Sequence, residues 1–388
     1  MNVGRGGAVA LLAVFVGLWL CAPTWASARN VKPVMGRLPA SAVGHLSASA
    51  LRGSALHSTK ATPRAKGHLS LTPSSLTYQG GHMRLSWSAS HAKVCTLSSR
   101  PQFWAGRDPA RVKCRGKITQ TLPALALGVH WTFTFKAKNA KGRASTVRRT
   151  LTLHKPPFKV SSNWSGYIVP STVPITSMSG EFTVPTLDCA KTRNAGEAVW
   201  VGTGGAGGTT GDLLQTGVVS DCVSGVQVED PGWWEEFPEL PAVFFNTMTV
   251  SPGDQIVATV SQGTDLSWTT RLDDLTTHIS GVMHTGDSYG TYPDPTPTTF
   301  TREGDASTVS YAGGRTAEWI VEDYGTATGL VPFADFGTVT FSSLATNLLT
   351  WALTPTEQVG LGDRSGLLLA APSAPDSTGK GFSVAYTG

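Results

Sequence analysis

The sequence has 388 residues and a formal net charge of +5. This length allows two or three domains and a sizeable core. Beyond the N-terminal region, no stretch approaches the roughly 18 consecutive apolar residues that a membrane-spanning helix needs. The composition therefore argues against an integral membrane protein.

The N-terminal stretch "MNVGRGGAVALLAVFVGLWLCAPTWASA" is typical of a secretory signal peptide. It has a basic start at Arg5, an apolar region over residues 8–20 and a small-residue cleavage site at 26–28. A lipid anchor on Cys21 is an alternative, but bulky residues precede that cysteine. We expect residues 1–28 to be removed and the protein to be secreted and extracellular.

Four cysteines remain after the signal peptide. An even number in an oxidising compartment predicts structural disulfides rather than a catalytic thiol. Proximity in sequence favours Cys95 with Cys114 and Cys189 with Cys222, one bridge in each half of the chain.

Charge divides the chain into two unlike parts. Residues 1–155 contain 23 basic residues and one acidic residue, a net of +22, whereas residues 156–388 contain 8 basic and 25 acidic residues, a net of −17. The acidic part gains little positive charge when its carboxylates protonate, so it suits acidic surroundings. The basic part could bind nucleic acid or cell wall, but we favour an intramolecular pro-region that neutralises the acidic part and is released in acid.

Composition predicts two β domains after a linker. Residues 29–67 are rich in Ser, Ala, Pro and basic residues and read as a basic pro-segment or linker. Residues 68–155 contain short alternating strands such as "MRLSWSAS" and "HWTFTFKAKN". They resemble a bacterial immunoglobulin-like module, although the two cysteines are too close in sequence for its usual inter-sheet bridge.

Residues 156–388 continue as strands with no convincing long helix. "MTVSPGDQIVATVS" and "FADFGTVTFSSL" each place turn residues before an alternating strand. The predicted fold class is all-β, a twisted double sheet whose concave face offers a substrate groove.

The stretch "AEWIVED" over residues 317–323 carries two glutamates in an apolar run. In a strand, Glu318, Ile320 and Glu322 share one face. An exposed strand face is the simple alternative. A glycosidase is another, but the backbone anchors of the two glutamates lie roughly 13 Å apart in a strand, and Ile320 stands where β-sandwich glucanases carry an acid.

A second unusual stretch is "DLLQTGVVSD", in which Gln215 interrupts an apolar strand. Its amide does not titrate, so it donates hydrogen bonds at any pH. Together with Glu322 it could hydrolyse a peptide bond, although a buried structural amide is the alternative. The sequence "GDSYG" matches a nucleophile-elbow pattern at Ser288, but the prolines that follow forbid the required helix, so we interpret Ser288 as a loop residue.

Eight motifs occur in the order found in one known family. They are "SNWSGY" (162–167), "AVWVGTGG" (198–205), "LLQTG" (213–217), "WWEEFPE" (233–239), "SPGDQI" (251–256), "LTT" (275–277), "AEWIVED" (317–323) and "VPFADF" (331–336). Over residues 160–345 the chain resembles a bacterial glutamic peptidase, or eqolisin. The resemblance implies a secreted acid endopeptidase with a concanavalin-like β-sandwich, protein or peptide substrates, no metal or other cofactor, and insensitivity to pepstatin. We expect a monomer that binds neither nucleic acid nor membrane.

The resemblance also assigns residues. It implies a catalytic pair of Gln215 and Glu322. The side chains expected to bind substrate or support the groove are Trp164, Trp200, Glu235 and Glu318. In the implied mechanism, water attacks directly, Glu322 takes a proton from the water and gives one to the leaving amine, and Gln215 stabilises the oxyanion. Because a free glutamate titrates near 4.3, the expected working range is roughly pH 2 to 5.

The sequence departs from the family pattern at three places. Gly204 stands where the family usually has an aspartate, and Glu236 stands where it has an aromatic residue. The first change is expected to alter how Gln215 is held, and the second to alter substrate preference. Residues 281–314 form a longer stretch than usual, which suggests a lid or specificity loop. If these departures disable the groove, a polysaccharide-binding β-sandwich is the rival function.

Overall fold

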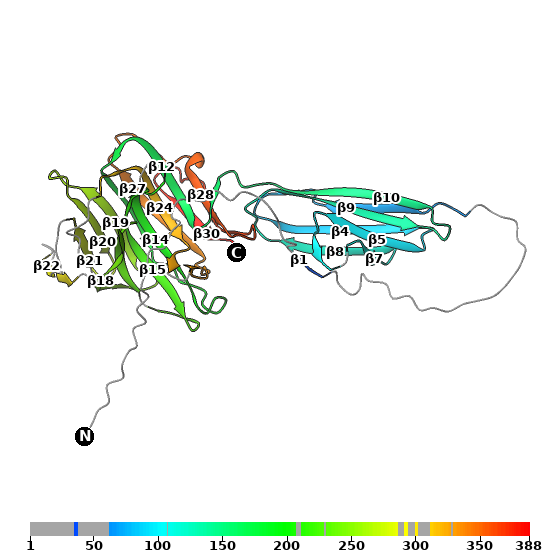
Figure 1. The fold of residues 1–388 in the computed structure, drawn as a ribbon, viewed down its shortest axis with the longest axis horizontal. Coiled ribbons are helices and arrows are strands. Elements are labelled where there is room, and N and C mark those ends of the chain that lie inside the picture. Colours follow the sequence, from blue (N-terminus) through cyan, green and yellow to red (C-terminus); the bar gives the residue numbers. More distant parts are fainter. Residues whose placement is uncertain are drawn as a thin grey trace, which may run out of the picture. The chain divides into compact units, whose positions relative to one another are not determined.

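The computed structural model describes residues 62–388 apart from 107, 207–210, 229, 286–290, 294–298, 302–310 and 327–328, together with strand β1 (Met35–Arg37) (Figure 1). Over these residues the regular secondary structure is almost entirely β-strand, which confirms the predicted all-β class. Helical structure in this part of the chain is one 3₁₀ turn, η3 (Pro355–Glu357). None of its helices is long and apolar enough to cross a membrane. The predicted signal peptide and Ser288 lie outside the described residues. So do most of the predicted linker and most of the long stretch over residues 281–314.

Contacts group the chain into two compact units. The larger unit comprises Phe158–Gly362 and Leu369–Tyr386. The smaller unit comprises Ser27–Pro157, Asp363–Leu368 and Thr387–Gly388. Each has its own apolar core.

The smaller unit consists chiefly of two sheets. Its three-stranded sheet has the order β2 (Lys66–Thr72), β4 (Gly81–Ser90), β8 (Arg115–Leu122). Its five-stranded sheet has the order β3 (Ser75–Leu76), β10 (Ala144–Leu153), β9 (Val129–Lys138), β5 (Val94–Arg100), β7 (Ala110–Val112), and β1 pairs with β6 (Trp104–Ala105). Apolar side chains at alternate positions, including Trp87 and Phe133, are buried in one core. The predicted bridge between Cys95 and Cys114 is present.

One continuous sheet path organises the larger unit. Its order is β18 (Leu240–Val250), β17 (Asp230–Phe237), β15 (Leu213–Val223), β14 (Ala195–Gly204), β24 (Gly314–Glu322), β12 (Trp164–Ile175), β28 (Gln358–Gly362), β29 (Leu368–Pro372), β30 (Phe382–Tyr386), β27 (Thr338–Thr346), β13 (Ser177–Thr183), β19 (Gln255–Gln262), β20 (Trp268–Asp274), β21 (Ile279–His284). The short strands beside this path are β11 (Lys159–Ser161), β16 (Val226–Gln227), β22 (Thr291–Pro293), β23 (Thr299–Thr301), β25 (Gly325–Thr326) and β26 (Gly329–Leu330).

The path folds back on itself as a double-layered β-structure. Strands β14 and β15 contact β19 and β20, which lie near the opposite end of the hydrogen-bonded order. The main apolar core fills the space between the layers and includes Val199, Leu214 and Trp319. A second apolar cluster, including Trp200 and Ile320, lies on the other face of the same strands. Strict alternation along β14 and β24 therefore supplies one face to the core and the other to a separate, polar-rimmed site.

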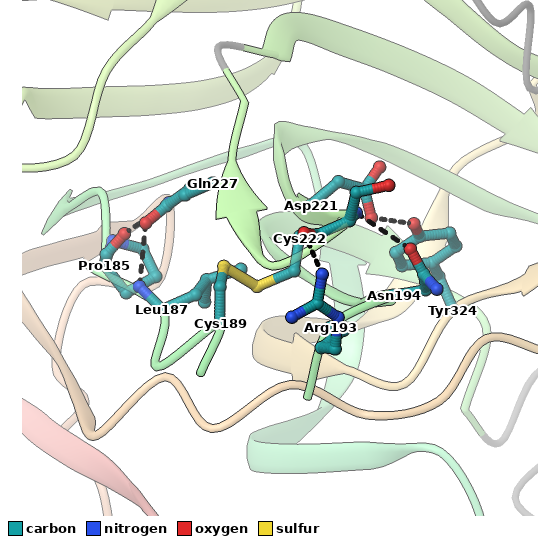
Figure 2. Close-up of a disulfide and its surroundings, with 10 residues drawn as sticks. Pro185, Leu187, Cys189, Arg193, Asn194, Asp221, Cys222, Gln227 and Tyr324 are labelled. Atoms are coloured by element: carbon teal, nitrogen blue, oxygen red, sulfur yellow. Dashed lines mark hydrogen bonds between the residues drawn. A yellow bond between two sulfur atoms is a disulfide. The ribbon is translucent and has the colours of Figure 1, made fainter. Parts of the chain in front are cut away.

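The second predicted bridge, between Cys189 and Cys222, is also present (Figure 2). It ties the segment before β14 to the far end of β15. Gln227 secures the same segment, because it accepts from the Leu187 N–H at 2.8 Å and donates to the Pro185 carbonyl at 3.0 Å. The strand that carries Gln215 is thus covalently fixed near its C-terminal end.

Candidate active site

Glu322 lies at the end of β24, in the middle of the sheet. The strand register places it opposite Trp164 of β12 on one side and Ala198 of β14 on the other. Its side chain is 8% exposed. Asn163 Nδ2 donates to Oε1 at 2.9 Å, and Trp200 Nε1 donates to Oε2 at 2.7 Å. Both donors are neutral, so they orient the carboxyl group without supplying a positive charge.

The turn between β11 and β12 sets the orientation of Asn163. Ser161 Oγ donates to Asn163 Oδ1 at 3.2 Å and accepts the backbone N–H groups of Asn163 and Trp164 at 3.3 and 3.2 Å. With its carbonyl oxygen engaged by Ser161, the Asn163 amide turns its NH₂ group toward Glu322. Sequence reasoning missed Asn163 as a site residue. The sequence feature that could have identified it is its position in "SNWSGY", directly before Trp164, the register partner of Glu322.

Trp200 has room beside Glu322 because its register partner on the adjacent strand is a glycine. Trp200 pairs with Gly217 of β15, and a Cβ at Gly217 would lie 2.6 Å from the Trp200 Cβ. The Trp164 ring packs edge-on against Trp200, with centroids 5.2 Å apart. Both predicted tryptophans are fully buried beside the carboxyl group. The sequence led us to expect both in a substrate groove, whereas the structure places them buried beside the Glu322 carboxyl group.

Burial governs the protonation of Glu322. Loss of hydration raises its pKa to about 7, and the side-chain N–H groups of Trp164, Trp200 and Asn163 oppose that rise. Trp164 acts electrostatically, since its Nε1 does not reach hydrogen-bond geometry. In acid solution Glu322 therefore carries a proton.

Gln215 lies on β15, on the same face of the sheet. Its register partners are Gly202 of β14 and Glu235 of β17. The side chain is 4% exposed, and its Nε2 donates to Glu235 Oε2 at 2.5 Å. The amide oxygen makes no hydrogen bond to any described residue. The hydrogen bond to Glu235 thus sets the orientation of the Gln215 amide, with its NH₂ group toward Glu235.

Glu235 connects Gln215 electrostatically to Glu322. Its pKa is raised to about 8, first by burial and then by the charge of Glu322, while the hydrogen bond from Gln215 lowers it. Glu235 is half-buried, whereas Glu322 is buried. The charge of Glu322 thus raises the pKa of the carboxyl group that holds the Gln215 amide. The register places Gln215 in the row of Glu318, on the sheet face that also carries Glu322.

Glu318 lies on the same face, two register rows from Glu322. It is fully buried, and its Oε1 accepts from the Ala206 N–H at 3.1 Å and from Thr316 Oγ1 at 2.9 Å. Burial raises its pKa to about 8; these two hydrogen bonds oppose the rise, and the charge of Glu322 adds to it. The alternative of an exposed strand face is therefore wrong for this pair. The expected alternation of "AEWIVED" is confirmed, because Trp319 and Val321 lie in the core on the other face.

Asp323 is the third acid whose protonation depends on Glu322. It is 6% exposed, and burial followed by the charge of Glu322 raises its pKa to about 8. Sequence reasoning did not single it out. The charge of Glu322 thus adds to the rise in pKa of Glu235, Glu318 and Asp323. Within the described residues, no group of three or more His, Cys, Asp or Glu side chains is arranged to hold a metal ion.

Comparison with known proteins identifies the family. Residues 162–356, half of the chain and the segment that holds all the site residues above, match the model of the family described as "Peptidase A4 family". The chain belongs to the Peptidase A4 family. The expected glutamic-peptidase relationship is thereby confirmed at family level.

Three relatives are similar to this member of the Peptidase A4 family. Aspergillopepsin-2 of Aspergillus niger is 32% identical over 201 residues, which cover 47% of this chain and 63% of the relative. A crystal structure of scytalido-glutamic peptidase with a transition-state analogue inhibitor is 23% identical, with a TM-score of 0.41, over 58% of this chain and 99% of that one. The crystal structure of aspergilloglutamic peptidase from Aspergillus niger is 29% identical, with a TM-score of 0.33, over 50% and 99%. The match thus spans less than two thirds of the length of aspergillopepsin-2.

Gly204, one departure from the family pattern, occupies a backbone position that excludes other residues. Its φ is +106°, and a Cβ there would lie 2.0 Å from the Asp212 carbonyl oxygen. Its register partner is Leu213 rather than Gln215. Gln215 is instead held by Glu235. The other departure, Glu236, pairs with Leu214 and lies on the opposite face from Glu235 by strand alternation.

We expect Gly204→Ala to destabilise the larger unit by about 2 kcal/mol or more, since both the backbone conformation and the space oppose a side chain. Urea unfolding followed by tryptophan fluorescence measures the change. Gly325→Ala is the matched control, because its nearest neighbouring atom would be 3.8 Å away. Equal stability of the two variants would contradict the assignment.

The buried acids predict that the larger unit is more stable in acid. Glu318 and Glu322 have folded-state pKa values of about 8 and 7, above the ordinary 4.5. The folded state therefore holds more protons than the unfolded state, and stability falls as pH rises from about 4.5 to about 8. We expect the calorimetric midpoint to be at least about 5 °C lower at pH 8 than at pH 4.

Substitution by glutamine isolates this effect, because glutamine cannot ionise. Glu318→Gln should reduce the difference between the two midpoints, whereas Glu239→Gln, at an exposed glutamate, should leave it unchanged. A midpoint that stays constant or rises between pH 4 and pH 8 would refute the explanation.

Proposed function

We propose that this chain is a secreted acid endopeptidase that hydrolyses peptide bonds by direct attack of water, with Glu322 and Gln215 as its catalytic residues. One observation carries the proposal. The buried Glu322 carboxyl group, bound by two neutral donors, lies on the same face of the sheet as the Gln215 amide, which is held by a hydrogen bond and does not titrate. Membership of the Peptidase A4 family supports a peptidase. The order of the eight sequence motifs supports the glutamic type.

Glu322 supplies both proton transfers in the first step. Its pKa of about 7 means that it starts protonated in acid. As water attacks the peptide carbonyl carbon, one oxygen of Glu322 accepts a proton from the water while the other gives its own proton to the carbonyl oxygen. The carboxyl group ends the step neutral, and the substrate becomes a tetrahedral diol.

Gln215 stabilises the substrate oxygen as charge develops. One N–H of its amide donates to Glu235, which leaves the second N–H for the substrate. Because the amide is uncharged at every pH, this donor persists in strong acid. A preoriented donor of this kind contributes about 3 kcal/mol to transition-state stabilisation.

Collapse of the diol reverses the proton flow. Glu322 gives its proton to the amide nitrogen, the C–N bond breaks, and a diol hydroxyl returns a proton to Glu322. The products are a carboxylic acid and an amine, and Glu322 is neutral again. Every proton is accounted for without an acyl-enzyme.

The remaining site residues act through these two. We propose that Asn163 and Trp200 orient Glu322, that Glu235 orients Gln215, and that Trp164 and Glu318 shape the electrostatic environment of Glu322. The burial of Trp164, Trp200 and Glu318 favours such positioning roles over the substrate contacts expected from the sequence.

The proposal includes the domain organisation expected from the sequence. Residues 1–28 would be a signal peptide, 29–67 a basic pro-segment or linker, 68–155 an immunoglobulin-like module and 156–388 the peptidase domain. Two disulfides are consistent with an extracellular location. Charge opposition between residues 1–155 and 156–388 supports an intramolecular role for the basic region at neutral pH.

The first test is cleavage of denatured casein between pH 2 and pH 8 with pepstatin present. We expect wild-type activity in acid and its loss as pH rises through about 7, because Glu322 must be protonated. Gln215→Ala should lower kcat by about 100-fold or more, whereas Gln255→Ala, at an exposed glutamine, should have no effect.

The same variants separate the rival functions. Hydrolysis of a glucan that survives Gln215→Ala would support a glycosidase that uses Glu318 and Glu322. Glycan binding without cleavage of any protein substrate, by a folded chain, would support a polysaccharide-binding protein and contradict the peptidase.

A further inference from the structure

The smaller unit carries a charge that its own residues cannot neutralise. Residues 62–157 contain 17 Lys and Arg and one acidic residue, Asp108. Asp108 is already paired with Arg100 at 2.9 Å, and it is the sole acidic residue of positions 1–155. Such an excess of one sign destabilises a compact domain through self-repulsion. This excess of positive charge suits the smaller unit to bind a partner of negative charge.

The three-stranded sheet presents its cations on one outward face. The register places Thr72, Arg84 and Thr119 in one row, Ser70, Ser86 and Lys117 in the next, and His68, Ser88 and Arg115 in the third. Each of these side chains is exposed or half-buried. Three consecutive rows thus carry one Lys or Arg each among hydroxyl groups, and we name these nine residues the cationic face.

The cationic face is supported rigidly from below. The alternate residues Leu69, Leu85, Trp87 and Ile118 are buried in the core of the unit. Trp87 Nε1 donates to the Lys113 carbonyl at 2.9 Å, which fixes β4 against the segment leading into β8. The cations therefore project from a sheet of fixed spacing rather than from a loop.

Hydroxyl groups on this face are already ordered across the strands. Ser70 Oγ and Ser86 Oγ lie 2.6 Å apart, and beside the face Thr121 Oγ1 lies 2.8 Å from His82 Nδ1. The cationic face contains no carboxylate and no Phe, Tyr or Trp. Its chemistry is that of guanidinium and ammonium groups separated by serine and threonine.

We propose that the cationic face binds an acidic polysaccharide. Residues within a row lie about 4.8 Å apart across the strands, and successive rows lie about 6.8 Å apart along them, so the three cations and the hydroxyl groups between them have fixed spacings. Arg84, Arg115 and Lys117 would pair with the acidic groups of the polymer, and the hydroxyl groups would exchange hydrogen bonds with its sugars. Single-stranded nucleic acid is disfavoured because the face offers no aromatic ring for base stacking. The inference stands independently of the proposed peptidase activity.

The test is titration of the full-length protein with a heparin oligosaccharide of defined length, by calorimetry at several salt concentrations. The variant Arg84→Gln/Arg115→Gln/Lys117→Gln removes three charges from the cationic face. The matched variant Lys136→Gln/Lys138→Gln/Arg148→Gln removes three charges from exposed positions of the five-stranded sheet. Both lower the net charge equally, so a difference between them reports location rather than total charge.

We expect the first variant to raise Kd about tenfold or more and to lower the salt slope of log Kd by about 2 to 3. The second should change Kd by less than about threefold. Equal effects of both variants would overturn the assignment of the face. Absence of binding by the wild type, or duplex DNA binding as tightly as heparin, would overturn an acidic polysaccharide as its ligand. Thermal midpoints of both variants confirm that they remain folded.

Discussion

The burial of one carboxyl group, that of Glu322, is the constraint on which the rest of the site depends. A glutamate removed from water cannot stay ionised without compensation. The site offers two neutral donors, Asn163 Nδ2 and Trp200 Nε1, rather than a cation. These donors orient both oxygens but leave the group neutral in acid. This state allows one group to serve as both proton donor and proton acceptor.

The sheet assembles that environment from remote parts of the sequence. Asn163, in the turn just before β12, and Trp200 of β14 approach Glu322 from its two sides, because β12 and β14 flank β24. Gln215 arrives one strand further along, and Glu235 one strand beyond it. Each contributes from the same face because strands alternate. The site is therefore a property of register, and a slip of one residue in any of these strands would turn its side chain into the core.

Much of this arrangement could be predicted from local pattern. Alternation in "AEWIVED" predicts the shared face of Glu318 and Glu322, and cysteine proximity predicts both disulfides. Motif order predicts the family. These features depend on strand geometry or on short sequence separations, which a single sequence displays.

Other features depend on strand pairing and could not be read from the sequence. The contact of Asn163 with Glu322, the anchoring of Gln215 by Glu235 and the raised pKa of Asp323 all follow from which strands are neighbours. The backbone conformation at Gly204, whose φ of +106° favours glycine, was likewise not readable from the sequence.

The most direct test of the account is kcat/KM for wild type and Glu322→Gln, measured between pH 3 and pH 8 on one fluorogenic peptide. Glutamine keeps the shape of the side chain but removes its exchangeable carboxyl proton. The account predicts at least a thousandfold lower kcat/KM for the variant throughout the acid range, a loss of about 4 kcal/mol in transition-state stabilisation, with a calorimetric midpoint that shows it is folded. A folded variant that retains more than about a tenth of wild-type kcat/KM would contradict it.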